Sequence, residues 1–112
     1  MQVFSESNDE FSEKCFTFIS SEKHKEGLEW CLLAAEQGHV TAQHMVGIMY
    51  DSGIGATQDY KQAAKWYTLA AEQGDVDAQY KLGHMYGSGR GVTEDDKQEV
   101  KWYTLAAEQG NA

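Results

Sequence analysis

Apolar residues recur with helical spacing through most of the chain. Between residues 40 and 51 the apolar positions follow an i, i+3, i+4, i+7, i+8 series, which lies along one side of an α-helix. They are Ala42, Met45, Val46, Met49 and Tyr50. Residues 59–73 repeat the series after a glycine-rich stretch at 52–57 that predicts a turn. The pattern therefore predicts two amphipathic helices that pack together as a pair.

This pair returns along the chain at a fixed interval. The pentapeptide Ala-Ala-Glu-Gln-Gly begins at residues 34, 70 and 106, and tryptophan stands at residues 30, 66 and 102, so both features recur every 36 residues. A constant period of roughly 20–50 residues is typical of a solenoid, in which each unit buries its apolar side against the next. The sequence thus predicts an all-α fold of about six helices, stacked as antiparallel pairs.

The period divides the chain into four segments. We expect residues 1–38 to form a divergent helix pair, residues 39–74 and 75–110 to form two full units, and residues 111–112 to start a further unit. Either the chain is a piece of a longer protein whose next repeat is missing, or its last helix covers the end of the stack.

Several residues have definite expected places in these helices. The first helix should cover residues 9–20, and the second residues 23–37, with Leu33 and Ala34 pointing inward. Asp75 can cap the N-terminus of one helix, and Thr93 can begin the last one. The three tryptophans should be buried between neighbouring helices: Trp30, Trp66 and Trp102.

Charge excludes two classes of partner. The chain has 18 acidic and 9 basic residues, a formal net charge of −9, which repels nucleic acid phosphates and anionic lipid headgroups. It contains no run approaching the ~20 apolar residues that span a bilayer, and its N-terminus is acidic where a signal peptide would be basic. We therefore expect no nucleic acid partner and no membrane insertion. The location is cytoplasmic for the chain as given, and periplasmic or secreted if it is a fragment.

The two cysteines follow neither a Cys-x-x-Cys spacing nor the 36-residue period. We expect Cys15 and Cys31 to be buried reduced thiols that act as small apolar side chains. A Cys15–Cys31 bridge between the first two helices is the alternative.

No group of residues in the sequence predicts a catalytic, metal or cofactor site. His39 and His44 are five residues apart, which is not the i, i+4 spacing of a helical metal site. The glycines of residues 87–91 lack the strand and the Gly-Lys-Ser/Thr sequence of a phosphate-binding loop. Since no nucleophile has a His and an acid at a recognisable spacing, we predict that the protein is not an enzyme and needs no cofactor.

Residues 39–110 resemble the Sel-one-like repeat, a helix-turn-helix unit related to the tetratricopeptide repeat. The matching positions are Ala78-Gln79, Leu82-Gly83, Met85-Tyr86, Gly89, Gly91-Val92, Asp95, Trp102-Tyr103, Ala106-Ala107 and Gly110. Residues 23–38 match as half a unit. The resemblance implies a right-handed α-solenoid whose first helices, called A helices here, line a concave face. It also implies a family of adaptor and scaffold proteins that assemble complexes.

The A helices carry the candidate partner-binding residues. Removing the core positions leaves a neighbouring face on residues 40–51 and its counterpart 36 residues later. The candidates on this face are Gln43, His44, Ile48, Asp51, Gln79, Tyr80 and His84. We predict that they bind a protein partner, with Ile48 and Tyr80 as apolar anchors. The alternatives are solvated positions that are free to vary, a structural spacer within a longer scaffold, and a small-ligand or enzyme-associated domain.

The last helix pair departs from the pattern at one core position. Glu99 stands where the first unit has Ala63, and a carboxylate on a packed face is costly unless it reaches water or a cation. An end unit without a polar cap exposes apolar surface. We therefore expect self-association through this pair, with Tyr103 and Leu105 as contacts.

Overall fold

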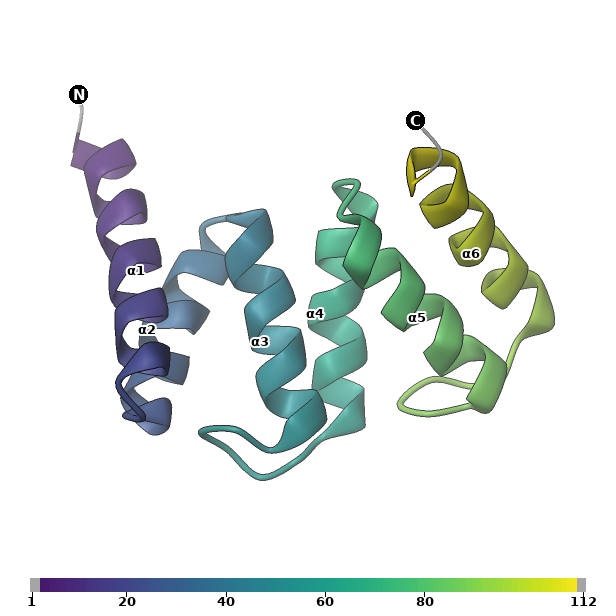
Figure 1. Ribbon diagram of the computed structural model, residues 1–112, viewed down its shortest axis with the longest axis horizontal. Coiled ribbons are helices and arrows are strands. Elements are labelled where there is room, and N and C mark those ends of the chain that lie inside the picture. The colour runs from purple at the N-terminus through teal and green to yellow at the C-terminus, as the bar shows by residue number, and fades with distance from the viewer. Residues whose placement is uncertain (1–2, 111–112) are drawn as a thin grey trace.

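The computed structural model describes residues 3–110, with side chains from Glu10 onward. These residues form six α-helices and no strand (Figure 1). The helices are α1 (Val3–Ser20), α2 (His24–Glu36), α3 (Val40–Ser52), α4 (Tyr60–Glu72), α5 (Val76–Ser88) and α6 (Asp96–Gly110). The predicted all-α solenoid is confirmed.

Each helix packs mainly against the helices before and after it in the chain. The pairs α1–α2, α3–α4 and α5–α6 stand side by side in Figure 1, so the molecule is elongated, measuring 41 × 32 × 20 Å. Because contacts stay between neighbours, no single central core forms. The buried residues fall into two clusters instead, one centred on α2 and α3 and the other on α4 and α5.

Aspartate side chains begin three of the helices. Asp59 and Asp75 accept hydrogen bonds from the backbone N–H of Gln62 and Ala78, at 3.1 and 2.9 Å. The predicted cap at Asp75 is confirmed, whereas the predicted start at Thr93 is wrong. Helix α6 begins at Asp96, and Asp95 accepts from the next free N–H groups, because a carboxylate immediately before a helix satisfies them directly.

Trp66 and Trp102 each join their own unit to the unit before it. Trp66 of α4 belongs to the first cluster and Trp102 of α6 to the second, and each is only 6% exposed. Their predicted burial is confirmed. Trp30 is only half-buried, although its indole meets the ring of Phe11 at 5.8 Å and the ammonium of Lys14 at 4.3 Å, both from α1. The prediction for Trp30 was therefore too strong.

Leu33 lies on the outside of the solenoid, contrary to the prediction. The buried side of α2 is formed by Leu28, Cys31, Ala34 and Ala35, and Leu33 is 40% exposed on the opposite side. The equivalent leucines of the later units, Leu69 and Leu105, are exposed to a similar extent.

Cys15 and Cys31 form a disulfide that joins α1 to α2, so the expectation of reduced thiols was wrong. Both side chains are fully buried, and their Cα atoms are 4.6 Å apart. The alternative expectation, a Cys15–Cys31 bridge between the first two helices, is the one that the structure shows, because the packing of α1 against α2 brings the two positions together.

A glycine on each A helix makes room for a tyrosine ring of the following helix. A Cβ atom on Gly47 would lie 2.6 Å from the ring of Tyr67, and one on Gly83 would lie 2.8 Å from the ring of Tyr103. These distances are too short for real contacts, so the rings would have to move. The glycines that weaken the helices therefore have a packing role.

We expect unequal effects when each glycine is replaced by alanine. Tyr67 is fully buried and its ring cannot move aside. Gly47→Ala should therefore lower the free energy of unfolding by about 1–2 kcal/mol, after the gain in helix propensity is counted. Tyr103 is half-buried on α6, so Gly83→Ala should change the free energy of unfolding by less than about 0.5 kcal/mol. Urea denaturation of both variants checks this, and equal losses would contradict it.

Candidate partner-binding surface

The candidate residues lie on α3 and α5, and the structure separates them into two groups. Gln43 and Gln79 are buried, at 4% and 3% exposure. The other five are half-buried or exposed. We call this second group the A-helix surface: His44, Ile48, Asp51, Tyr80 and His84.

Gln43 and Gln79 hold neighbouring units together and are not available to a partner. The Gln43 side-chain amide donates to the carbonyl of Ala35 at 3.2 Å, and its oxygen accepts from Gln73 at 2.8 Å. Gln79 makes the same bonds with Ala71 and Gln109, at 3.2 and 3.0 Å. We therefore leave both residues out of the candidate surface, because a buried amide needs these hydrogen-bond partners.

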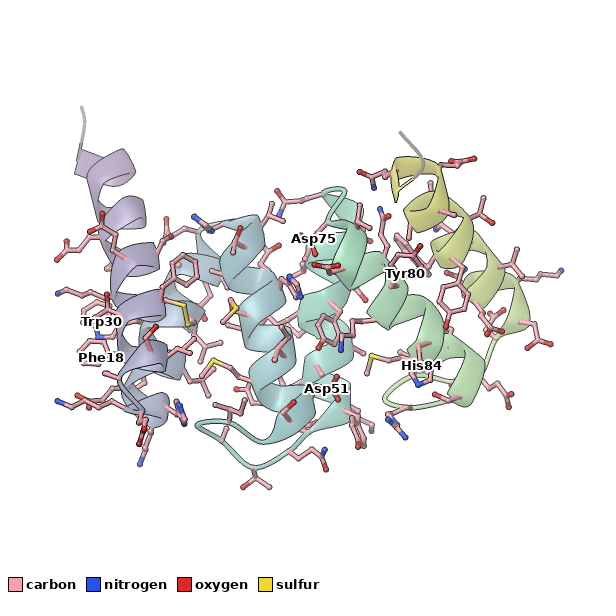
Figure 2. The ribbon with its side chains drawn as sticks, viewed as in Figure 1. Phe18, Trp30, Asp51, Asp75, Tyr80 and His84 are labelled. Atoms are coloured by element: carbon pink, nitrogen blue, oxygen red, sulfur yellow. A yellow bond between two sulfur atoms is a disulfide. The ribbon has the colours of Figure 1, made fainter. Side chains whose placement is uncertain are left out.

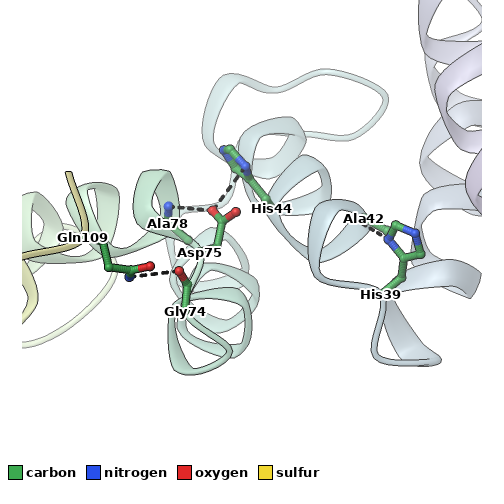
Figure 3. Close-up of polar contacts among 7 residues, drawn as sticks. All are labelled: His39, Ala42, His44, Gly74, Asp75, Ala78 and Gln109. Carbon is green, nitrogen blue, oxygen red and sulfur yellow. Dashed lines mark hydrogen bonds and ion pairs between the residues drawn. The ribbon is translucent and has the colours of Figure 1, made fainter. Parts of the chain in front are cut away.

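The same network includes a backbone carbonyl at the end of each unit. Gln73 also donates to the carbonyl of Gly38 at 3.2 Å. Gln109 donates in the same way to the carbonyl of Gly74 at 3.0 Å, as Figure 3 shows. The glutamine of the repeated pentapeptide therefore contacts the glycine of the preceding pentapeptide. We call these bonds, together with those of Gln43 and Gln79, the glutamine ladder.

His44 contacts the next unit. Its Nδ1 atom lies 3.4 Å from Oδ2 of Asp75, the oxygen that also accepts from the N–H of Ala78 (Figure 3). The His44 side chain is only 17% exposed, and its ring lies 6.3 Å from that of Tyr67. It thus forms one edge of the A-helix surface and also links α3 to the start of α5.

Asp51 accepts a hydrogen bond from the hydroxyl of Tyr67 at 3.1 Å, although the two residues belong to different helices. Burial raises the pKa of Tyr67 well above its ordinary range, and the negative charge of Asp51 and this hydrogen bond raise it further. Ile48 is half-buried against the second cluster. Asp51 and Ile48 therefore lie at the surface but also contribute to packing.

The buried phenol predicts a loss of stability in alkaline solution. In the unfolded chain Tyr67 ionises near pH 10, whereas in the folded chain it stays neutral to higher pH. Its contribution is complete below pH 10 and falls as the pH rises further, by at most about 1.4 kcal/mol per pH unit. Denaturation at pH 9 and at pH 11 should show a larger loss for wild type than for Tyr67→Phe. Equal losses would contradict the assignment.

Tyr80 and His84 are the exposed members of the A-helix surface. Tyr80 is 46% exposed, and its ring lies 6.1 Å from that of Tyr103. His84 follows one turn later on α5, and Asp51 marks the end of α3 nearest to it in the view of Figure 2. These residues give the surface an aromatic side chain, an imidazole and a carboxylate within two successive units.

Glu99 lies beside the A-helix surface. The sequence had marked it only as a departure from the core pattern of the repeat. Its carboxylate contacts the place that a side chain at Gly87 would occupy. Gly87 stands one period after Asp51, and Glu99 one period after Ala63. The two departures compensate each other in space, and Glu99 is also only half-buried, in line with the expectation that it reaches water.

Identity or difference between the two units is a signal in the sequence that separates the two groups of candidates. Gln43 and Gln79 are identical across the period, as are Gly47 and Gly83, and all four have structural roles. The members of the A-helix surface differ across the same period.

Other kinds of site find no support in the described part of the chain. Among residues 10–110, no three His, Cys, Asp or Glu side chains gather as they would around a metal ion. Of the helices formed by residues 3–110, none is both long and apolar enough to cross a bilayer.

A family model described as the Sel1 repeat matches residues 21–39, 40–75 and 76–111. Curated proteins give no significant match in sequence. Among solved structures, one similar protein is c5321, a protective antigen of uropathogenic Escherichia coli strains that displays an SLR fold. It is 46% identical over 77% of this chain, with a TM-score of 0.74.

Two further solved structures are similar. A Sel1 repeat protein from Oxalobacter formigenes is 34% identical over 85% of this chain, with a TM-score of 0.78. Cysteine rich protein B from Helicobacter pylori is 26% identical over 86%, with a TM-score of 0.77. The chain spans 18% of the length of c5321, 39% of the Oxalobacter protein and 74% of the Helicobacter protein.

Proposed function

The chain belongs to the Sel1 repeat family, and on that premise we propose that it binds a partner protein through the A-helix surface. Proteins of this family are commonly modules for protein–protein interaction and are generally non-enzymatic scaffolds. The observation that carries the proposal is the exposure of Tyr80, a large aromatic side chain, at a position that differs between the two units. Exposed aromatic side chains are common anchors at protein interfaces.

A capture experiment with matched variants tests this proposal. The variant Tyr80→Ser with His84→Ser removes the exposed members of the A-helix surface. The control variant Lys65→Ser with Leu69→Ser changes two exposed residues of α4 instead. Immobilised wild type should capture a protein from a lysate of its source cells, the control should capture the same protein, and the first variant should lose it. Equal capture by both folded variants, or no capture by wild type, would favour a structural spacer.

The disulfide supports a proposal about location. Disulfides persist in oxidising compartments and are rare in the reducing cytosol. Since the bond between Cys15 and Cys31 is fully buried, it has a structural place in the fold. We infer that the protein works in the periplasm or is secreted, rather than in the cytoplasm. Fractionation of the source cells tests this, and recovery from the cytoplasm alone would contradict it.

The outer face of α6 supports self-association. Val100 is 62% exposed, whereas Ala64, one period earlier, is only 4% exposed because α5 packs against α4. On the same helix, Leu105 is 36% exposed and Tyr103 is half-buried. Two copies can bury these apolar side chains against each other.

We expect sedimentation to show a concentration-dependent dimer that Val100→Lys weakens. The substitution places a charge on the exposed face without disturbing either buried cluster. A strict monomer at high concentration would contradict the proposal.

A further inference from the structure

Asp51 and Glu99 place a carboxylate at the same location in two successive units. In the first unit the carboxylate comes from α3, where Asp51 stands near the C-terminal end. In the second unit the equivalent residue of α5 is Gly87, and the carboxylate comes from Glu99 of α6.

The carboxylate of Glu99 lies where a side chain on Gly87 would begin. A Cβ atom on Gly87 would lie 2.6 Å from Cδ of Glu99 and 3.1 Å from its Oε1. The Glu99 carboxylate therefore fills the volume that an aspartate side chain at residue 87 would need. Because Gly87 and Asp51 are one period apart, the Glu99 carboxylate corresponds in position to the Asp51 side chain of the preceding unit.

Neither carboxylate has a cationic partner among the described residues. The ion pairs within 4.0 Å in residues 10–110 join Glu10 to Lys14 and His44 to Asp75. Asp51 accepts from the neutral hydroxyl of Tyr67, and both Asp51 and Glu99 are half-buried. A half-buried carboxylate keeps a negative charge that a cation from a partner can approach with little screening.

The rest of the A-helix surface adds apolar contact to these charges. Tyr80 and the exposed part of Ile48 lie on the same two helices. Lys81 is a basic residue of α5, and it lies about 120° round the helix from residue 87. The surface thus presents two carboxylates one unit apart, with an aromatic side chain from the second unit.

We propose that the A-helix surface binds a basic, extended segment of the partner protein. One Lys or Arg of that segment pairs with Asp51 and another with Glu99, while an apolar side chain of the segment packs against Tyr80. This inference rests on the proposed function and specifies the chemistry of the partner.

Two synthetic peptides serve as probes. Both are fluorescent 16-residue peptides that repeat Lys-Ser-Leu-Ser in one case and Glu-Ser-Leu-Ser in the other. Binding is measured by fluorescence anisotropy at 150 mM salt, which screens interactions between distant exposed charges. Wild type should bind the lysine peptide at least tenfold more tightly than the glutamate peptide.

Matched variants separate a local effect from net charge. Asp51→Asn with Glu99→Gln should weaken binding of the lysine peptide at least tenfold, and asparagine still accepts the Tyr67 hydrogen bond. The control, Glu72→Gln with Glu108→Gln, removes two exposed acids one period apart on α4 and α6 and changes the net charge equally, from −9 to −7. It should weaken binding less than twofold. Equal weakening by both variants would overturn the inference.

A relocation variant tests the equivalence of the two positions. Gly87→Asp with Glu99→Ala returns the carboxylate of the second unit to α5, as in the first unit. Binding of the lysine peptide should stay within threefold of wild type. Weakening as large as that of Asp51→Asn with Glu99→Gln would overturn the inference.

The glutamate peptide distinguishes the two proposals. If that peptide binds more tightly and the Tyr80→Ser, His84→Ser variant loses it, the basic segment is excluded while binding at the A-helix surface stands. If the lysine peptide binds equally to wild type and to every variant of this surface, neither proposal survives.

Discussion

Replacing Trp66 by alanine should lower the free energy of unfolding by about 3–5 kcal/mol. The indole is 6% exposed and belongs to a cluster formed mainly by α2 and α3, although Trp66 itself belongs to α4. Its removal leaves a cavity in the cluster that joins two units, and the residues around such a cavity relax only in part. Urea denaturation followed by circular dichroism measures the loss.

Trp30→Ala is the matched control for this substitution. Trp30 occupies the same position one period earlier but is half-buried. Its replacement by alanine should therefore lower the free energy of unfolding by only about 1–2 kcal/mol. A loss below about 1 kcal/mol for Trp66→Ala would show that Trp66 is not a core residue.

Removing the Cys15–Cys31 disulfide should lower stability by about 3 kcal/mol, the value expected for a closed loop of similar length to the 16-residue separation found here. Without the bond, the unfolded chain gains conformational freedom between α1 and α2. The double variant Cys15→Ala, Cys31→Ala and the reduced wild-type protein should both show this loss in denaturant.

The double variant also supplies the control. A reducing agent should destabilise wild type and leave the variant unchanged, since the variant contains no thiol. Titration of thiols in the unfolded, unreduced protein should find none. Two free thiols would show that the bond is not formed.

The helices and their stacking could be predicted because the period fixes both. A 36-residue repeat containing two amphipathic segments leaves few arrangements other than stacked pairs, and the burial of Trp66 and Trp102 follows from it. The predictions failed where a contact depends on neighbouring units. The pairing of Cys15 with Cys31 and the partial exposure of Trp30 both result from how α1, which does not follow the repeat, covers α2.

The candidate surface was predicted only in part, because helical spacing does not distinguish a partner-binding face from a unit-to-unit contact. Gln43 and His44 are adjacent on α3, yet Gln43 is buried in the glutamine ladder and His44 borders the surface. The sequence also could not predict that Glu99 fills the space left by Gly87, since the two residues meet only through the packing of α5 on α6.

The glutamine ladder limits the ways in which the length of this protein can change. Its bonds join residues separated by 8, 30 or 35 positions, and every member has an identical counterpart 36 positions away. Loss of residues 40–75 would bring Gln109 and Gln79 into register with Gly38 and Ala35, so every broken rung would have a replacement. Loss of a segment of another length that removes part of a helix would shift these residues out of register and leave the buried amides without partners. Changes of length that include the helices therefore preserve the ladder only in whole multiples of one unit, which is how recombination between its own repeats would lengthen or shorten the solenoid.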